Sequence, residues 1–142
     1  MATSTTTQSR SRQVLIVDDN VDTAESLALL LSMEGHSALC AHNGEMALQL
    51  AARQPPEVVV LDIGLPGMDG FEVARRLRAV HSDRQMRIIV TSGYGRPVDR
   101  LTAERSGVDV YLLKPVDPVV VCAEIERFTD GAIVVHTAGL SG

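Results

Sequence analysis

Four short apolar runs stand out along the chain, at residues 14–17, 58–61, 88–90 and 110–113. None of them contains a charged residue, and Val, Ile and Leu dominate all four. Unbroken runs of this length are typical of strands buried on both faces of a parallel sheet, whereas half-exposed strands alternate. A weaker run at residues 38–41 predicts one more short strand. Segments with helical spacing of apolar residues separate the runs, so the pattern predicts five β-α units.

Turn and cap residues set the expected helix boundaries. Asn20 suits the N-cap of the first helix, which should end near Gly35. Pro97 suits the first turn of a fourth helix ending near residue 106, and Pro118 that of the fifth. The second and third helices are expected at about residues 45–53 and around residues 71–77.

Alternating strands and helices predict an α/β fold with a parallel sheet covered on both faces. Right-handed crossovers between parallel strands then favour a doubly wound sheet of five strands in the order 2-1-3-4-5. The expected architecture is a flavodoxin-like three-layer sandwich.

Composition divides the chain into one domain and two tails. Residues 1–12 are Ser/Thr-rich with almost no apolar residues, which predicts a disordered tail. Residues 13–130 form the expected domain, and residues 131–142 a C-terminal tail. The apolar stretch at 132–135 fits either a stray edge strand or a disordered segment.

Charge and cysteine content narrow the functional classes. The net charge of −5 argues against nucleic-acid binding, which needs a basic face. Because no apolar stretch approaches the roughly 20 residues that span a bilayer, no membrane insertion is expected. Cys40 and Cys122 have no metal-binding or redox spacing, which favours buried thiols in a cytoplasmic protein. The four histidines, which also lack ligand spacing, are expected to be solvated.

Polar residues with distinct chemistry follow the strands. The acids Asp18, Asp19 and Asp62 end the first and third strands. The hydroxyls of Thr91 and Ser92 end the fourth strand, and Lys114 follows the fifth. Strand carboxyl ends of an open α/β sheet meet at one crevice, so these side chains should converge there. Acids, a hydroxyl and a lysine together predict a site for a divalent metal and a phosphoryl group.

The order of these motifs resembles the receiver domain of two-component response regulators, the CheY-like superfamily. The resemblance rests on Asp18-Asp19, the stretch LDIGLPGMDG at residues 61–70, the hydroxyl before Gly93, and Lys114-Pro115. It covers about residues 13–128, and the sequence around the motifs is most similar to that of receivers of hybrid sensor kinases. Any one of these motifs is common, but their combination in this order, each at a strand end, is highly specific.

The resemblance implies a role for each of these residues. Asp62 would be the phosphoacceptor, and Lys114 would neutralise the phosphoryl oxygens. Mg²⁺, with Mn²⁺ as an alternative, would bind Asp19, Asp62 and the backbone carbonyl of Gly64, with Asp18 acting through water. Ser92 lies 30 residues after Asp62 and 22 before Lys114, the spacing of the family's hydroxyl, whereas Thr91 misses both by one.

Two further roles follow from the same resemblance. Tyr111 on the fifth strand would be a switch residue that fills space vacated when Ser92 moves toward the phosphoryl group. Gly64 and Tyr94 would flank the path of the hydrolytic water and tune the lifetime of the phosphoryl group. The resemblance also suggests a cis Lys114-Pro115 bond.

The expected function is therefore that of a single-domain response regulator in a phosphorelay, not of an enzyme. A histidine kinase or a histidine phosphotransfer protein would donate the phosphoryl group, and a downstream protein, unidentified from sequence, would bind the surface of helix 4, strand 5 and helix 5. The protein would be a monomer or a weak phosphorylation-dependent dimer. The alternative is a Mg²⁺-dependent phosphatase of the haloacid dehalogenase type. Its nucleophile needs a second Asp two residues on, where this chain has Asn20 or Gly64.

Overall fold

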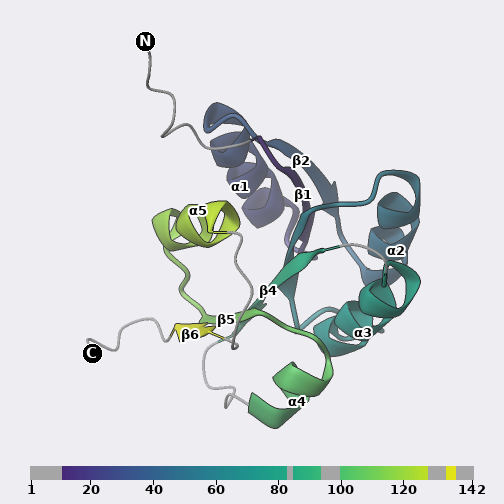
Figure 1. Cartoon of the computed structure of the whole chain (residues 1–142). Helices are drawn as coiled ribbons and strands as arrows, with labels where there is room; N and C mark the ends of the chain where they lie inside the picture. The colour runs from purple at the N-terminus through teal and green to yellow at the C-terminus, as the bar shows by residue number, and fades with distance from the viewer. Residues whose placement is uncertain (1–10, 83–84, 94–99, 128–133, 137–142) are drawn as a thin grey trace.

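The computed structural model describes residues 11–82, 85–93, 100–127 and 134–136 (Figure 1). Strands and helices alternate from the first strand to the last. The strands are β1 (Gln13–Val17), β2 (Ser37–Ala41), β3 (Val58–Asp62), β4 (Arg87–Ser92), β5 (Val110–Leu113) and β6 (Val134–His136). The helices are α1 (Val21–Met33), α2 (Gly44–Arg53), α3 (Gly70–Val80), α4 (Arg100–Arg105) and α5 (Pro118–Glu126).

All strands pair in parallel in one sheet with the order β2-β1-β3-β4-β5-β6. The predicted order 2-1-3-4-5 is thus confirmed, with β6 added beyond β5. β6 lies within residues 131–142, so of the two alternatives for the apolar stretch there, the structure contains the edge strand.

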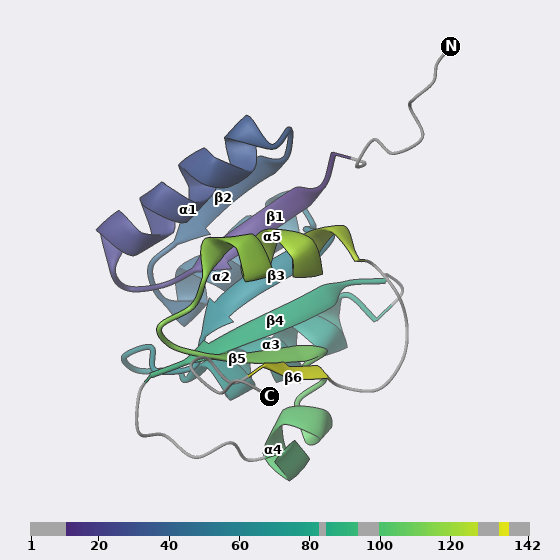
Figure 2. The same ribbon diagram turned by 90° about the vertical axis from the view of Figure 1, so that its left-hand side faces the viewer.

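The sheet is the middle layer of three, with α1 and α5 on one face and α2, α3 and α4 on the other (Figure 2). Alternate residues of each strand enter two separate cores. Val14, Ile16, Val58 and Val60 pack under α1 and α5. Leu15, Val17, Val59 and Leu61 pack under α2 and α3. This double burial explains why the strands read as unbroken apolar runs.

Side-chain caps begin the helices at the carboxyl edge of the sheet. As predicted, Asn20 accepts a hydrogen bond from the backbone N–H of Thr23 at 3.0 Å and begins α1. Asp117 caps α5 in the same way, accepting from Val119 N–H at 2.9 Å. α4 is described from Arg100, so its expected start at Pro97 lies outside the described residues.

The loop from β3 to α3 is folded tightly beside Asp62. Gly67 has a φ of +80°, which favours glycine. At Gly70 an added Cβ would lie 2.5 Å from Ile63 Cα, so only glycine fits where α3 begins. The start of α3 is therefore held directly against the residue that follows Asp62.

The expectation of solvated histidines is wrong for two of them. His36 is 5 % exposed and His81 is 9 % exposed. The Nδ1 of His36 accepts the backbone N–H of Arg12 at 3.1 Å, and its Nε2 lies 3.7 Å from a Glu126 carboxylate oxygen. In the part of the chain that the structure describes, no helix combines the length and apolar character needed to cross a bilayer.

Candidate functional site

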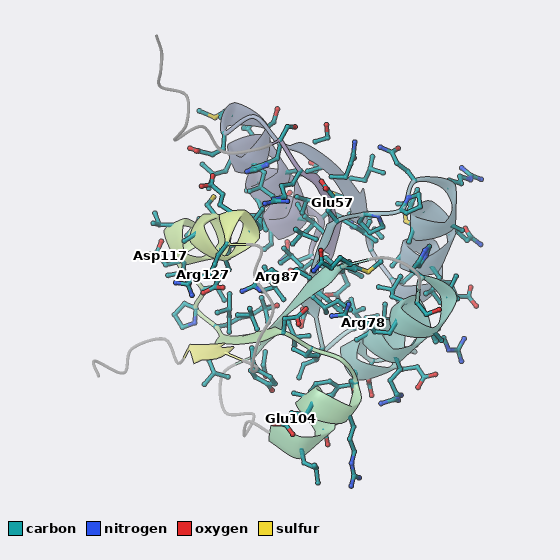
Figure 3. The ribbon with its side chains drawn as sticks, viewed as in Figure 1. Glu57, Arg78, Arg87, Glu104, Asp117 and Arg127 are labelled. Atoms are coloured by element: carbon teal, nitrogen blue, oxygen red, sulfur yellow. The ribbon has the colours of Figure 1, made fainter. Side chains whose placement is uncertain are left out.

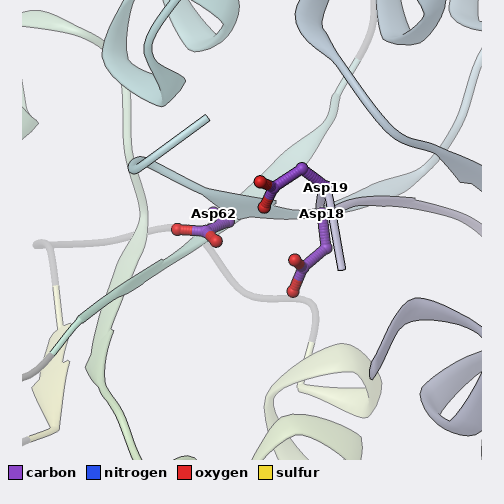
Figure 4. A group of neighbouring side chains, drawn as sticks. All are labelled: Asp18, Asp19 and Asp62. Atoms are coloured by element: carbon purple, nitrogen blue, oxygen red, sulfur yellow. The ribbon is translucent and has the colours of Figure 1, made fainter. Parts of the chain in front are cut away.

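Three carboxylates meet at the carboxyl edge of the sheet (Figure 4). Asp18 and Asp19 follow β1, and Asp62 is the last residue of β3, the strand beside it. Oxygen atoms of the three side chains lie within 4.8 Å of one another. Oxygens around one Mg²⁺ are at most about 4.2 Å apart, twice the usual bond length. The cluster therefore gathers oxygen ligands of the kind that a small hard cation prefers, close enough together to share one ion.

Hydrogen bonds fix the orientation of the Asp62 carboxylate. Its Oδ1 accepts the backbone N–H of Gly64 at 2.8 Å, and its Oδ2 accepts the Lys114 ammonium at 3.0 Å. The side chain of Asp62 is 9 % exposed and that of Lys114 is 36 % exposed, so the pair lies at the mouth of a crevice. The carboxylate is positioned, yet a small reagent can still reach it.

Asp18 carries the clearest electrostatic signal of the cluster. Burial raises the pKa of its carboxyl group, and the nearby charges of Asp62 and Asp19 raise it further. The backbone N–H of Asn20, which donates at 2.9 Å, and the Lys114 charge act in the opposite direction on this pKa. Asp19 is exposed. Three carboxylates face a single ammonium group here, and a bound cation would relieve this imbalance.

The segment carrying Lys114 is anchored to β4. The backbone N–H of Lys114 donates to the Ser92 carbonyl at 2.8 Å. The Lys114-Pro115 peptide bond is cis, in agreement with the sequence expectation.

The two hydroxyls of β4 face opposite sides of the sheet, because strand neighbours alternate. Thr91 pairs in register with Asp62 and lines the same cavity as Asp62 and Lys114. Ser92 lies two residues after Val90 and therefore shares its face of the sheet. Val90 packs in the core that also contains Tyr111. The Ser92 Oγ is fully buried and has no hydrogen-bond partner among the residues that the structure describes. Sequence spacing identifies Ser92 as the family's hydroxyl and does not identify Thr91. Alternation along β4 is the signal that points to Thr91, because it places Thr91 on the face of the sheet opposite to Ser92.

The remaining predicted residues differ in how well they can be placed. Gly64 is beside the site, and a Cβ there would lie 3.4 Å from Asp62 Oδ1. Tyr111 is 1 % exposed and its ring centroid lies 6.3 Å from that of Phe71. It is therefore turned inward. Tyr94 lies outside the described residues.

A cavity of about 480 Å³ extends from the acidic cluster into the space between α1, α5 and the sheet. Asp18, Asp62, Thr91 and Lys114 stand at its polar end. Leu27 and Leu30 of α1 and Val121 of α5 are among its apolar lining residues. The sequence analysis did not predict this cavity, since it depends on the distance between two helices far apart in the chain.

A family model described as the response regulator receiver domain matches residues 14–126. An uncharacterized 14.6 kDa protein of Leptolyngbya boryana is 37 % identical over 115 residues, which cover 81 % of this chain and 88 % of that protein. The transcriptional regulatory protein AfsQ1 of Streptomyces coelicolor is 38 % identical over 112 residues, covering 79 % of this chain. The chain spans only 48 % of AfsQ1, so the remainder of that regulator has no counterpart in this match.

Solved structures agree with the fold. A putative response regulator from Chloroflexus aurantiacus superposes with a TM-score of 0.75 at 28 % identity, covering 84 % of this chain and 98 % of that one. A CheY-like receiver domain protein from Methanospirillum hungatei gives a TM-score of 0.76 at 25 % identity, covering 83 % and 93 %. The five-stranded core and its helices are thus shared with these proteins.

Proposed function

This chain belongs to the response regulator receiver family, and we propose that Asp62 is its phosphoacceptor. Receiver domains are phosphoacceptor switches that histidine kinases phosphorylate, and they bind Mg²⁺ at an acidic pocket. The observation that carries the assignment to Asp62 is its position. It is the carboxylate held by both the Lys114 ammonium and the Gly64 N–H, and it lies next to the carboxylates of Asp18 and Asp19.

The proposed reaction transfers one phosphoryl group. An oxygen of the Asp62 carboxylate attacks the phosphorus of a phosphohistidine on a kinase or a phosphotransfer protein. The bond between phosphorus and the imidazole nitrogen breaks, the electron pair stays on the imidazole, and an acyl phosphate remains on Asp62. Positioning and charge neutralisation are the main contributions that such a transfer needs from the protein.

Asp19, Asp62 and the Gly64 carbonyl are the proposed direct ligands of Mg²⁺ or Mn²⁺, with Asp18 acting through water. When bound, the cation would neutralise negative charge on the transferring phosphoryl oxygens. Lys114 supplies the second positive charge. Its ammonium group is already 3.0 Å from Asp62 and can contact a phosphoryl oxygen there after a small rotation.

Ser92 is the proposed donor to the phosphoryl group. Its Oγ is buried without a partner in the described part of the chain, and a buried hydroxyl in that state gains free energy from any acceptor that arrives. If Ser92 turns toward Asp62, it vacates space on the Tyr111 side of the sheet, which the Tyr111 ring can fill. The proposed output is a change in the surface of α4, β5 and α5, which binds a downstream protein.

Gly64 and Tyr94 are proposed to set the lifetime of the phosphoryl group. Gly64 offers no side chain to obstruct a hydrolytic water, whereas Tyr94 is bulky. Tyr94→Ala should therefore speed self-dephosphorylation several-fold, measured as the loss of the protein-bound phosphoryl group after the donor is removed. An unchanged half-life would contradict this role.

The test of the function is incubation with acetyl phosphate and Mg²⁺. The protein should gain one phosphoryl group by intact mass, and EDTA should prevent the gain. A haloacid dehalogenase-type phosphatase would instead turn over phosphomonoesters rapidly and retain no label. Neither Asp18 nor Asp62 has the second Asp two residues on that such enzymes use. Nucleic-acid binding is not part of the proposed function, because the chain carries a net charge of −5.

A further inference from the structure

Strand β6 lies beyond the part of the chain that the family shares. The family match ends at residue 126, whereas β6 begins at Val134. β6 pairs in parallel with β5, with Val110 opposite Val134, Tyr111 opposite Val135 and Leu112 opposite His136. It forms the outer edge of the sheet in Figure 2. The edge of β5, which would otherwise end the five-stranded sheet, is thus filled by a three-residue segment.

The path from β5 to β6 has the opposite hand to every other crossover in the sheet. β3 to β4 and β4 to β5 advance toward the β6 edge by way of α3 and α4, which pack on one face. β1 to β2 runs toward the other edge by way of α1, on the opposite face. β5 to β6 advances toward the β6 edge, yet α5 packs on the α1 face (Figure 2). The β5-α5-β6 connection is therefore left-handed if the others are right-handed.

Handedness has an energetic meaning in a twisted sheet. About 98 % of crossovers between parallel strands of one sheet are right-handed, because only that hand lets a right-twisted strand and its helix pack back onto the sheet. All the other crossovers here share one hand, which is the favoured one. A chain that fills its own β5 edge through α5 must therefore adopt the disfavoured hand, and three residue pairs offer little to offset it.

The constraint disappears when the strand comes from another molecule. We infer that the β5 edge is a strand-docking site and that residues 134–136 of a second copy of this chain are its preferred occupant. Two copies would exchange these segments reciprocally around a two-fold axis, each filling the β5 edge of the other. The parallel register of β5 with β6 is retained, but neither chain needs a left-handed crossover.

Chemistry at the edge suits this occupant. β5 presents Val110, Tyr111 and Leu112, and the docking segment has the β-branched pair Val134-Val135. β-branched and aromatic neighbours are favourable across paired strands. The exchange needs no phosphoryl group, so it can be tested apart from the proposed function.

The experiment uses the full chain without phosphorylation. A sample mixed from ¹⁵N-labelled and ¹³C-labelled copies should give intermolecular NOEs between residues 110–112 and residues 134–136. Sedimentation should show a dimer whose fraction rises with protein concentration. NOEs confined within one chain, with a monomer at the NMR concentration, would overturn the inference, as would a dimer that lacks these intermolecular contacts.

A matched pair of variants tests the strand itself. Val134→Pro/Val135→Pro removes two backbone N–H groups, at least one of which faces β5 in a parallel ladder, whereas Val134→Thr/Val135→Thr keeps both. The proline pair should abolish the dimer and the threonine pair should retain it. Amide signals of residues 13–92 report whether the fold of each variant is intact. A dimer that survives the proline pair would rule out strand exchange.

Discussion

The carboxyl edge and the amino edge of the sheet, where the strands end and begin, differ in how their charges are balanced. At the carboxyl edge, Asp18, Asp19 and Asp62 face the single ammonium of Lys114. At the amino edge lies Arg87, which is labelled in Figure 3. Its buried guanidinium meets the buried carboxylate of Glu124 at 2.7 Å and also donates to the Glu124 carbonyl at 3.0 Å. One edge holds excess negative charge that a ligand can neutralise, and the other is already neutralised within the chain.

A second arginine strengthens the amino edge. The guanidinium of Arg78 donates to the carbonyls of Met86 and Gly107 and pairs with Asp109 at 2.7 Å. Asp109 in turn accepts the backbone N–H of Ile88 at 2.8 Å. These contacts join α3 to the starts of β4 and β5. The comparison indicates that stability resides at the amino edge and chemistry at the carboxyl edge, so substitutions at the two edges should have separable effects.

The largest effect is expected from Asp62→Asn at the carboxyl edge. An amide is a poor nucleophile, so the variant should take up no label from acetyl phosphate in the time that saturates the unaltered protein. Thermal unfolding should show no loss of stability, because a charge is removed from a crowded cluster. Labelling of Asp62→Asn at the original rate would mean that the phosphoacceptor lies elsewhere.

The second effect concerns the amino edge, with Glu124→Gln as the probe. Removing one partner of a buried ion pair typically costs about 3–5 kcal/mol because the other charge stays buried. Urea unfolding should show that the free energy of unfolding falls by this amount. Phosphoryl uptake from acetyl phosphate, counted per folded molecule, should be unchanged. Arg87→Met/Glu124→Leu is the control, since replacing both charges should recover most of the loss. A double variant no more stable than Glu124→Gln would show that the unpaired buried charge of Arg87 does not cause the loss of stability.

Ser92 and Thr91 allow a sharper comparison within the carboxyl edge. Ser92→Ala should uncouple the amide shifts across residues 92–120 from beryllofluoride binding and slow labelling several-fold. Thr91→Val keeps the size of the side chain that lines the cavity and should leave the shifts in place. If Thr91→Val alone abolishes the amide shifts, the hydrogen-bond donor to the phosphoryl group is Thr91 and not Ser92.

The smallest effect is expected from Asp18→Asn in metal-free protein. Since the folded state raises the Asp18 pKa above the ordinary aspartate value of 3.8, its ionisation opposes folding. The stability linked to this group is present below that value and is lost as the pH rises through the raised pKa. Asp18→Asn should therefore be more stable than the unaltered chain at neutral pH, by less than about 1 kcal/mol, the scale of partly exposed charge interactions.

Calorimetry at pH 3.5 and pH 7 without Mg²⁺ measures this difference. The gain should be much smaller at the lower pH, because fewer Asp18 carboxyl groups are ionised there. Added Mg²⁺ should stabilise the unaltered chain more than the variant. A stability difference that stays constant with pH would show that the effect is not electrostatic.

What could be predicted from the sequence is what local pattern determines. Buried strands appear as unbroken apolar runs, so the polar residue that ends each run can be recognised, and the sequence alone predicts that Asp62 and Lys114 lie at one edge. Asn20 was recognisable as a cap because its partner lies only three residues away. The choice between Thr91 and Ser92 was harder, since spacing and strand alternation draw attention to different hydroxyls.

Features that depend on distant segments could not be predicted in this way. Arg87 and Glu124 are 37 residues apart, and nothing near either one indicates the other. His36 is adjacent to a glycine in a turn-like stretch, yet Arg12 and the end of α5 bury it. The edge pairing of β6 joins residues 24 positions apart, from Val110 to Val134, through a connection whose hand no local pattern specifies.

The close contact at Gly70 has a consequence for how this protein tolerates change. A methyl group there would collide with the Ile63 backbone and displace the start of α3. The loop from Asp62 to Asp69 would shift with it, and the acidic cluster would lose its alignment although no charged group had been altered. In a saturation mutagenesis screen for phosphoryl uptake, Gly70 should therefore be as intolerant as Asp62. Such a screen would mark as essential a position that takes no part in the chemistry.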